Sequence, residues 1–280
     1  MSVKIIVDST VDLAPELKDR FRVVPLAVRF GEEEYLDSVT IDSRTFYEKL
    51  AVSEALPTTS QPTPVSFEEV YEEATADGSQ AVVITIAAAL SGTYQSATIA
   101  AEDFPGKVFV VDSRNASIGA GVLAQYALTL AERGMTGEQI LEELIRARKQ
   151  IRLCFLVDTL EYLKKGGRLN AAVAVVGGLL GIKPILQIEA PGEIKVLGTA
   201  RGMKKAFASL NELSVKYGGP DKTRPVLLGY TGVSDENLNK YLEEAGSAWA
   251  SGIPGTRIGS AIGVHVGPGA VAFAFFEAEE

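Results

Sequence analysis

In the first half of the chain, short apolar and β-branched runs alternate with longer segments that suit helices. The runs at 4–7, 81–86 and 107–111 predict strands, and the segments at 94–102, 117–133 and 136–150 predict helices. Strands that alternate with helices favour a parallel sheet covered on both faces. We therefore predict an N-terminal three-layer α/β/α domain with a parallel sheet over residues 1–150.

The pattern changes in the second half. Strand-like segments occur at 153–157, 183–189, 195–199, 226–231 and 270–277, with helices predicted at 203–217 and 236–249. In the last strand, side chains alternate between two faces: Val271, Phe273 and Phe275 on one, Ala270, Ala272, Ala274 and Phe276 on the other. We predict a C-terminal two-layer α/β domain with a mixed or antiparallel sheet over residues 151–280, the boundary being approximate. The fold class is thus α/β with two domains.

Polar residues follow the first three predicted strands. They are Asp8-Ser9-Thr10, Ser91-Gly92-Thr93 and Asp112-Ser113. The carboxyl ends of parallel strands share one edge of a sheet, and ligands usually bind beyond that edge. We expect these three segments to lie on the same rim.

Composition narrows the function classes. The chain has 280 residues with a net charge of −9, which opposes non-specific binding to nucleic acid. Its single cysteine, Cys154, cannot form an internal disulfide, and its apolar surroundings predict a buried residue. The N-terminus lacks a signal-peptide pattern, and the longest apolar run, Ala171–Ile182, is shorter than the ~20 residues that span a bilayer. These features predict a soluble, cytoplasmic protein.

His265 is the only histidine, and it lies within Gly263-Val264-His265-Val266-Gly267-Pro268-Gly269. An imidazole is the side chain that ordinarily titrates near neutral pH. The surrounding glycines predict a tight turn or a close approach of the backbone to a neighbour. A lone histidine is more often a hydrogen-bonded structural residue, so other motifs must decide its role.

Two hydroxyl-rich segments are candidates for ligand contact. Thr58-Thr59-Ser60-Gln61-Pro62 predicts a stiff extended loop, or simply a connector that ends in a helix cap at Ser66. Ser91 precedes Gly92 at a predicted helix start, where free N–H groups suit an anion, although it could be no more than a capping serine. A nucleophilic Ser91 is also conceivable, but Ala89 occupies the first glycine position of the Gly-x-Ser-x-Gly elbow.

A basic segment and an apolar segment follow residue 160. Lys164, Lys165 and Arg168 accompany two glycines, which indicates either a helix C-terminus or a docking site that holds Arg168 out toward a phosphate or acidic surface. The run 171–182 suits either core packing or the wall of an elongated ligand tunnel. One histidine and one cysteine cannot build a typical zinc site, and no dinucleotide fingerprint follows a strand, so neither metal nor cofactor is predicted.

Six motifs, in order from the first strand to the last, resemble the DegV family of bacterial lipid-binding proteins, the fatty-acid-binding subunits of the fatty acid kinase system. The matching segments are Val7-Asp8-Ser9-Thr10 with Asp12-Leu13, Thr59-Ser60-Gln61-Pro62, Leu90-Ser91-Gly92-Thr93-Tyr94-Gln95-Ser96-Ala97, Val111-Asp112-Ser113, Leu160-Glu161-Tyr162-Leu163 with Lys165-Gly166-Gly167-Arg168, and Ile262-Gly263-Val264-His265 with Gly267-Pro268-Gly269. The resemblance covers the whole chain.

The resemblance implies a protein that holds one long-chain fatty acid and has no activity of its own. Its acyl chain would lie in a buried tunnel of the C-terminal domain, and its carboxylate at the domain interface. The implied carboxylate ligands are Thr59, Ser91 and His265, and the neighbouring head-group loop residues are Ser60, Gly92 and Thr93. Two hydroxyls and an imidazole N–H can donate to a buried carboxylate, which is costly to leave unpaired. The run 171–182 and the Phe-rich last strand would then have a purpose beyond packing.

The resemblance also implies partners. A kinase subunit related to dihydroxyacetone kinases would phosphorylate the bound acid to an acyl phosphate for phospholipid metabolism, and Arg168 and Arg201 would help to dock it. Transient contact with a membrane would allow exchange of the fatty acid. Two alternatives stay open: a serine hydrolase or acyltransferase that uses Ser91 and His265, and a module that binds sugar phosphate or dihydroxyacetone.

Overall fold

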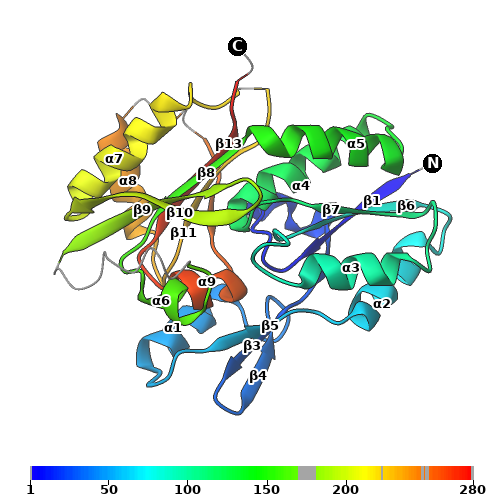
Figure 1. Cartoon of the computed structure of the whole chain (residues 1–280), viewed down its shortest axis with the longest axis horizontal. Coiled ribbons are helices and arrows are strands. Elements are labelled where there is room, and N and C mark those ends of the chain that lie inside the picture. The colour runs from blue at the N-terminus through cyan, green and yellow to red at the C-terminus, as the bar shows by residue number, and fades with distance from the viewer. Residues whose placement is uncertain (1, 170–180, 222, 247–248, 250–251, 279–280) are drawn as a thin grey trace.

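The computed structural model describes residues 2–169, 181–221, 223–246, 249 and 252–278. Its first half contains a four-stranded parallel sheet, as predicted (Figure 1). The order is β2-β1-β6-β7, with β1 at Val3–Asp8, β2 at Arg22–Val24, β6 at Gln80–Thr85 and β7 at Val108–Asp112. Helices α2 (Pro64–Thr75) and α3 (Thr93–Ala101) cover one face, and α4 (Ser117–Glu132) and α5 (Gly137–Ala147) the other.

The second half contains a six-stranded sheet in the order β10-β9-β8-β13-β11-β12. The strands are β8 (Ile151–Leu156), β9 (Ile182–Glu189), β10 (Glu193–Arg201), β11 (Val226–Tyr230), β12 (Gly255–Arg257) and β13 (Val271–Phe276). Only the β11–β12 pair is parallel, so the sheet is mixed, which is one of the two predicted forms.

Helices pack on both faces of this second sheet. Helices α7 (Met203–Lys216) and α8 (Glu236–Ala245) cover one face. Helix α8 is shorter than the predicted 236–249, because Gly246 turns the chain with a φ of 56°. The opposite face, which has no helix of its own in a two-layer domain, packs against α4 from the first half. Helix α4, which both sheets share, therefore lies on the N-terminal side of the predicted boundary at residue 150, with α5 between them.

A small third sheet escaped prediction. Strands β3 (Ala27–Phe30), β4 (Glu33–Leu36) and β5 (Thr58–Ser60) pair antiparallel in the order β4-β3-β5, next to helix α1 (Ser43–Val52). The predicted extended loop at Thr59 is thus an edge strand that pairs with Val28. The predicted cap at Ser66 is wrong, since Thr63 caps α2 by accepting a hydrogen bond from the Ser66 N–H.

Two short helices lie between this third sheet and the second one. They are α6 (Glu161–Lys165) and α9 (Ser260–Val266), which carries His265 (Figure 1). The glycines of this segment make the predicted close approaches. A Cβ on Gly263 would lie 2.6 Å from the Phe46 ring, and one on Gly267 would lie 2.4 Å from the Tyr162 ring. Helix α9 therefore packs tightly against both α1 and α6.

The two faces of β13 belong to different cores, as the alternating pattern predicts. Phe273 and Phe275 stack with ring centroids 5.3 Å apart and pack with Trp249 beneath α7 and α8. Ala272 and Phe276 face the other way, into the core that surrounds α4. Cys154 is buried, as predicted.

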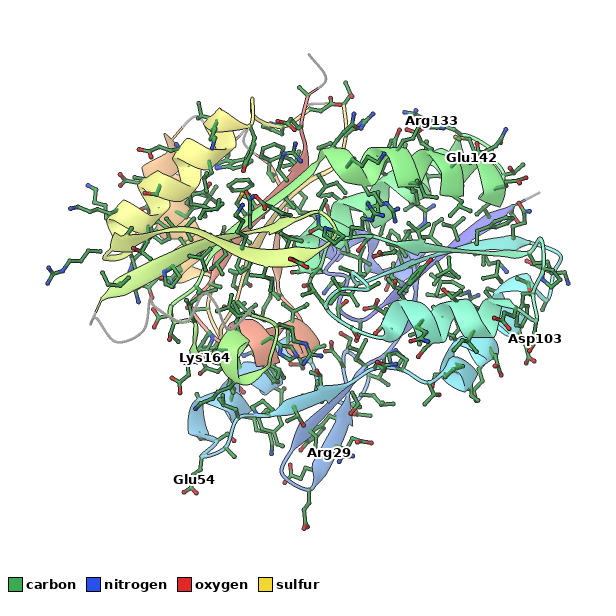
Figure 2. The ribbon with its side chains drawn as sticks, viewed as in Figure 1. Arg29, Glu54, Asp103, Arg133, Glu142 and Lys164 are labelled. Atoms are coloured by element: carbon green, nitrogen blue, oxygen red, sulfur yellow. The ribbon has the colours of Figure 1, made fainter. Side chains whose placement is uncertain are left out.

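Charged side chains extend outward around the molecule; Arg29, Glu54, Asp103, Arg133, Glu142 and Lys164 are examples (Figure 2). Among the described residues, no helix combines the length and apolar character needed to cross a bilayer. Nor does the part of the chain that the structure describes contain three or more His, Cys, Asp or Glu side chains grouped as metal ligands.

Candidate functional site

A cavity lies between the two large sheets, with α4 on one side and α9 at its mouth. It contains about 760 Å³ of atom-free space, part of which is open to solvent. Its apolar lining consists of Leu26, Ile86, Leu90, Ala116, Leu153, Phe155, Leu163, Ile188, Ile194, Ile258, Ala261, Ile262, Val266, Ala270 and Ala272. Its polar lining consists of Thr10, Thr59, Ser91, Ser117, Arg168 and His265.

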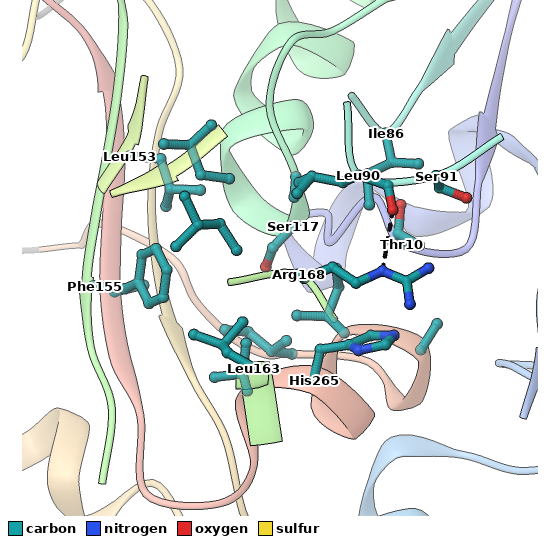
Figure 3. Close-up of a pocket in the computed structure, with 18 of the residues that line it drawn as sticks. Thr10, Ile86, Leu90, Ser91, Ser117, Leu153, Phe155, Leu163, Arg168 and His265 are labelled. Atoms are coloured by element: carbon teal, nitrogen blue, oxygen red, sulfur yellow. Dashed lines mark hydrogen bonds between the residues drawn. The ribbon is translucent and has the colours of Figure 1, made fainter. Parts of the chain in front are cut away.

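The polar groups gather toward one end of the cavity. Figure 3 shows Leu153 and Phe155 at one end and Ser91 and Arg168 at the other. His265 lies on the lower side of the polar end in the same view. An apolar chamber with hydrogen-bonding groups at one end suits a ligand that has a long apolar part and one polar head.

Small residues of β13 make room for the chamber. Ala270 and Ala272 line it, whereas Phe273 and Phe275 lie on the opposite face of the strand. The expectation that the phenylalanines of this strand serve the ligand is therefore wrong for these two residues. Alanine leaves space where a larger side chain would fill it.

His265 is held at the polar end by a hydrogen bond. Its Nε2 lies 3.0 Å from Thr59 Oγ1, so β5 and α9 meet here although 206 positions separate the two residues. Its buried Nδ1 has no hydrogen-bond partner among the described residues. Gly166 packs so closely that a Cβ there would lie 2.2 Å from Nδ1.

The imidazole is neutral in this environment. Burial lowers the pKa of His265 to about 4, and the positive charge of Arg168 contributes in the same direction. At neutral pH His265 therefore offers one N–H donor and one acceptor rather than a fixed charge.

Buried carboxylates fix the start of α9. Asp12 accepts a hydrogen bond from the Gly259 N–H at 2.7 Å, and Asp37 accepts from the N–H groups of Ser260 at 3.2 Å and Ala261 at 3.1 Å. Burial raises the pKa of Asp12 to about 7 and also raises that of Asp37. These contacts anchor the helix that positions His265.

Asp37 was missed by the sequence reasoning. It lies 223 positions from Ser260, and no local sequence motif predicts a contact between residues so far apart.

The predicted rim is confirmed, and Asp8 links its loops. This buried carboxylate accepts from the N–H groups of Thr10 at 2.9 Å and Ile86 at 2.7 Å, which joins the ends of β1 and β6. Asp112, at the end of β7, accepts from the Ala88 N–H at 3.2 Å in the same region. Burial raises the pKa of Asp8 to about 6. Thr10, on this rim, lines the cavity but was not singled out as a ligand.

Ser91 lines the cavity, but its hydroxyl is not bonded to His265. Its Oγ lies 2.8 Å from Thr93 Oγ1 and accepts weakly from the Thr93 N–H at 3.3 Å. Neither Thr93 nor Gly92 lines the cavity. The Gln61 amide packs directly over Gly92, since a Cβ there would lie 2.2 Å from Gln61 Oε1. Ser60 is exposed on β5 and also lies outside the lining.

Arg168 turns inward. Its Nε donates to the Leu90 carbonyl at 3.2 Å and one terminal nitrogen donates to the Gly166 carbonyl at 2.7 Å, and the side chain lines the cavity (Figure 3). The side chain is half-buried rather than held out into solvent, and its part in docking the kinase stays a prediction. Arg201 is exposed at the end of β10, away from the cavity lining. Most of the apolar run 171–182, namely 171–180, lies outside the described residues.

Residues 2–278 match a family model described as an uncharacterised protein of the DegV family. A DegV domain-containing protein from Deinococcus radiodurans is 36% identical over 276 residues, which cover 98% of each chain.

Solved structures agree with this match. The chain is similar to a DegV family protein from Thermus thermophilus described by its fatty acid binding, with a TM-score of 0.88, 35% identity and coverage of 99% and 100%. It is also similar to DegV from Bacillus subtilis, described as a fatty acid binding protein, with a TM-score of 0.83, 30% identity and coverage of 99% and 100%. The chain therefore belongs to the DegV family.

Proposed function

We propose that this protein binds one long-chain fatty acid and presents it to a fatty acid kinase. The observation that carries the proposal is the cavity itself, which is walled by apolar side chains and has hydrogen-bonding groups at one end. The similar structures from Thermus thermophilus and Bacillus subtilis, both described as fatty acid binding, support it.

The apolar wall would supply most of the affinity. Each methylene removed from water contributes about 0.8 kcal/mol, so a long acyl chain along Leu153, Phe155 and Ile188 gains more than its head group. The space left by Ala270 and Ala272 would accommodate that chain.

The head group would lie between Thr59, Ser91 and His265. The two hydroxyls donate to a carboxylate. With hydrogen on Nε2, His265 donates its single N–H to Thr59 Oγ1, which leaves the Thr59 hydroxyl hydrogen free to be donated to the ligand. Arg168 adds a positive charge on the same side of the cavity. Two carbonyl groups hold its guanidinium in place, so Arg168 would stabilise the carboxylate through its charge, from its present position.

The kinase would act on the exposed carboxylate oxygen at the mouth. That oxygen attacks the γ-phosphorus of ATP held by the kinase, the bond to ADP breaks, and an acyl phosphate forms. This chain supplies no catalytic group to the step. It positions the acid and excludes water from the acyl chain. Because ATP is the phosphoryl donor, the proposal places the protein in the cytoplasm.

Lipid extraction and native mass spectrometry of the purified protein test the binding step. We expect one long-chain acid per chain, retained on purification or taken up from solution. A protein that neither retains nor takes up such an acid would overturn the proposal.

Variants test the head-group assignment. Thr59→Val and Ser91→Ala each remove a hydroxyl donor, and His265→Ala removes the imidazole that orients the Thr59 hydroxyl. We expect tenfold to hundredfold weaker binding in each variant, since hydrogen bonds to charged groups contribute about 1.5–3 kcal/mol. Thr58→Val is the matched control, because Thr58 is the exposed neighbour on β5 and is absent from the cavity lining. Unchanged affinity in Ser91→Ala and His265→Ala together would remove the assignment.

A serine hydrolase is the second candidate, and the structure offers it less support. His265 bonds to Thr59 rather than to Ser91, and its Nδ1 lacks an acidic partner among the described residues. A triad needs both contacts. A serine-reactive phosphonate that labelled Ser91 would favour this candidate over binding alone.

A further inference from the structure

A second pocket is lined by residues of β8 and β9 and adjoins the apolar cavity. Its lining includes Arg114, Arg148, Lys149, Arg152, Gln187 and Tyr217, and it holds about 1000 Å³ of atom-free space, including its open mouth. Leu153 and Ile188 line both this pocket and the apolar cavity, so the two share a wall. None of the proposed carboxylate ligands takes part in it.

The pocket arises where two strands separate. The pairing of β8 with β9 runs from Leu156–Ile185 to Cys154–Gln187 and stops there. Beyond that point the strands diverge, and the loop after β7 and the turn after α5 close the gap with Arg114 and Arg148. A glycine of the β9–β10 turn, Gly192, packs against this loop, since a Cβ there would lie 3.4 Å from the Arg114 backbone. The two halves of the chain thus build the pocket together.

Four cations line this pocket in a chain whose net charge is −9. Within the described part of the chain, Arg114, Arg148 and Lys149 form no salt bridge. Among the described lining residues, Glu189 is the one acidic side chain, and it is paired with Lys195 at 3.0 Å. Arg152 is paired with Glu277 and lies 5.3 Å from the Tyr217 ring centre. The described lining residues therefore carry more positive than negative charge.

Arg148 carries an unused donor. One terminal nitrogen donates to the Asp112 carbonyl, but its Nε is buried and has no acceptor among the described residues. Leaving a buried donor without a partner costs about 1–3 kcal/mol. Burial, followed by the positive charge of Arg114, lowers the pKa of the Arg148 guanidinium, and the negative charge of Asp112 offsets part of this shift. An anion bound between Arg114 and Arg148 would offer an acceptor to the Arg148 Nε–H and would reduce the repulsion between the two guanidinium groups.

We propose that this pocket binds the phosphate group of a small molecule. Arg114, Arg148 and Lys149 surround the phosphate, and guanidinium groups are well matched to its oxygens. The Tyr217 ring and the shared apolar wall border the remaining space, which is larger than a phosphate alone requires. The site is independent of the fatty-acid proposal, because it uses different residues.

Titration calorimetry with pyrophosphate and with AMP tests the proposal on the intact protein. Binding of either probe with a dissociation constant below about 1 mM supports it. A preference for AMP identifies an organic phosphate as the ligand class, and equal or tighter binding of pyrophosphate identifies free phosphates. If neither probe binds at millimolar concentration in low salt, the proposal is overturned.

Variants locate the binding. Lys149→Glu changes an exposed side chain. Arg114→Asn introduces a residue that tolerates the backbone φ of 52° at this position. We expect at least tenfold weaker probe binding in each. Arg146→Gln is the control, since Arg146 is exposed on α5 and paired with Glu143 outside the pocket lining. Unchanged binding in both pocket variants, with fatty-acid uptake intact, would show that the probe binds elsewhere and overturn the proposal.

Discussion

The two faces of β13 show how one strand can serve opposite purposes. On one face, Phe273 and Phe275 fill the space beneath α7 and α8 together with Trp249. On the other, Ala270 and Ala272 leave a cavity open toward α4. Alternation along a strand keeps the two requirements apart, so a close-packed core and a binding chamber share one backbone. Substitutions on the first face should therefore affect stability, and substitutions on the second should affect the ligand.

The largest expected effect is on the packed face. Phe273→Ala removes a fully buried ring and should lower the free energy of unfolding by about 3–5 kcal/mol, measured by urea denaturation. Fatty-acid stoichiometry should stay at that of the wild type. If the variant does not fold, Phe273→Leu offers the same comparison with a smaller loss. Lost binding in a folded Phe273→Leu protein would contradict the separation of the two faces.

The next effect is on the cavity face. Ala272→Leu projects three further carbons into the chamber and should exclude two or three methylenes of a long acyl chain. At about 0.8 kcal/mol for each methylene, affinity should fall roughly tenfold or more for long acids and less for short ones. Displacement of a fluorescent fatty acid by acids of graded chain length measures this. Equal losses at every chain length would argue against the assigned position of the acyl chain.

A smaller effect is the pH dependence of stability that Asp12, near the polar end of the cavity, produces. Its pKa is about 7 in the folded protein and near 3.8 when unfolded, so between these values the folded state binds more protons. The stability contributed by Asp12 therefore falls as pH rises, by up to about 1.4 kcal/mol for each pH unit. Asp12→Asn should remove this slope. Urea midpoints at pH 5.5, 6.5 and 7.5 measure it, with Asp19→Asn at an exposed position as the control.

The smallest expected effect is that His265 does not titrate near neutral pH. His265, with a pKa of about 4, should stay neutral from pH 5.5 to 8 in the ligand-free protein. Because it is the only histidine, ¹⁵N NMR of the labelled imidazole reports on it alone. A midpoint near 6.5 would show that the polar end is better hydrated than its burial indicates. The unfolded imidazole gains a proton below pH 6.5, so His265 opposes the slope of Asp12.

The sequence predicted what depends on local pattern. Alternation assigned the two faces of β13, and the order of strands and helices predicted the parallel sheet and the rim that Asp8 links. The family resemblance assigned Thr59 and His265 to one predicted site, and the structure places the two side chains within hydrogen-bond distance. That contact supports their assignment as ligands, which stays a prediction.

What escaped prediction depends on contacts between distant segments. Strand β5 exists because β3 pairs with it, and its own three residues carry no strand pattern. The role of Asp37 depends on α9, which lies more than 220 positions away. Arg168 was expected to extend into solvent because lysines and glycines surround it, but the nearby Leu90 carbonyl turns it inward.

Helix α4 has a consequence for how the chain folds. Gly121 lets it approach the loop after β1, where a Cβ would lie 2.0 Å from the Asp12 carbonyl oxygen, and the helix also packs against β13 and β11 of the other sheet. Neither half can complete its interior without this helix, because a single continuous core surrounds it. A fragment ending near residue 150 would expose to water the side of α4 that meets the second sheet. The two halves are therefore expected to gain and lose structure together, as one cooperative unit.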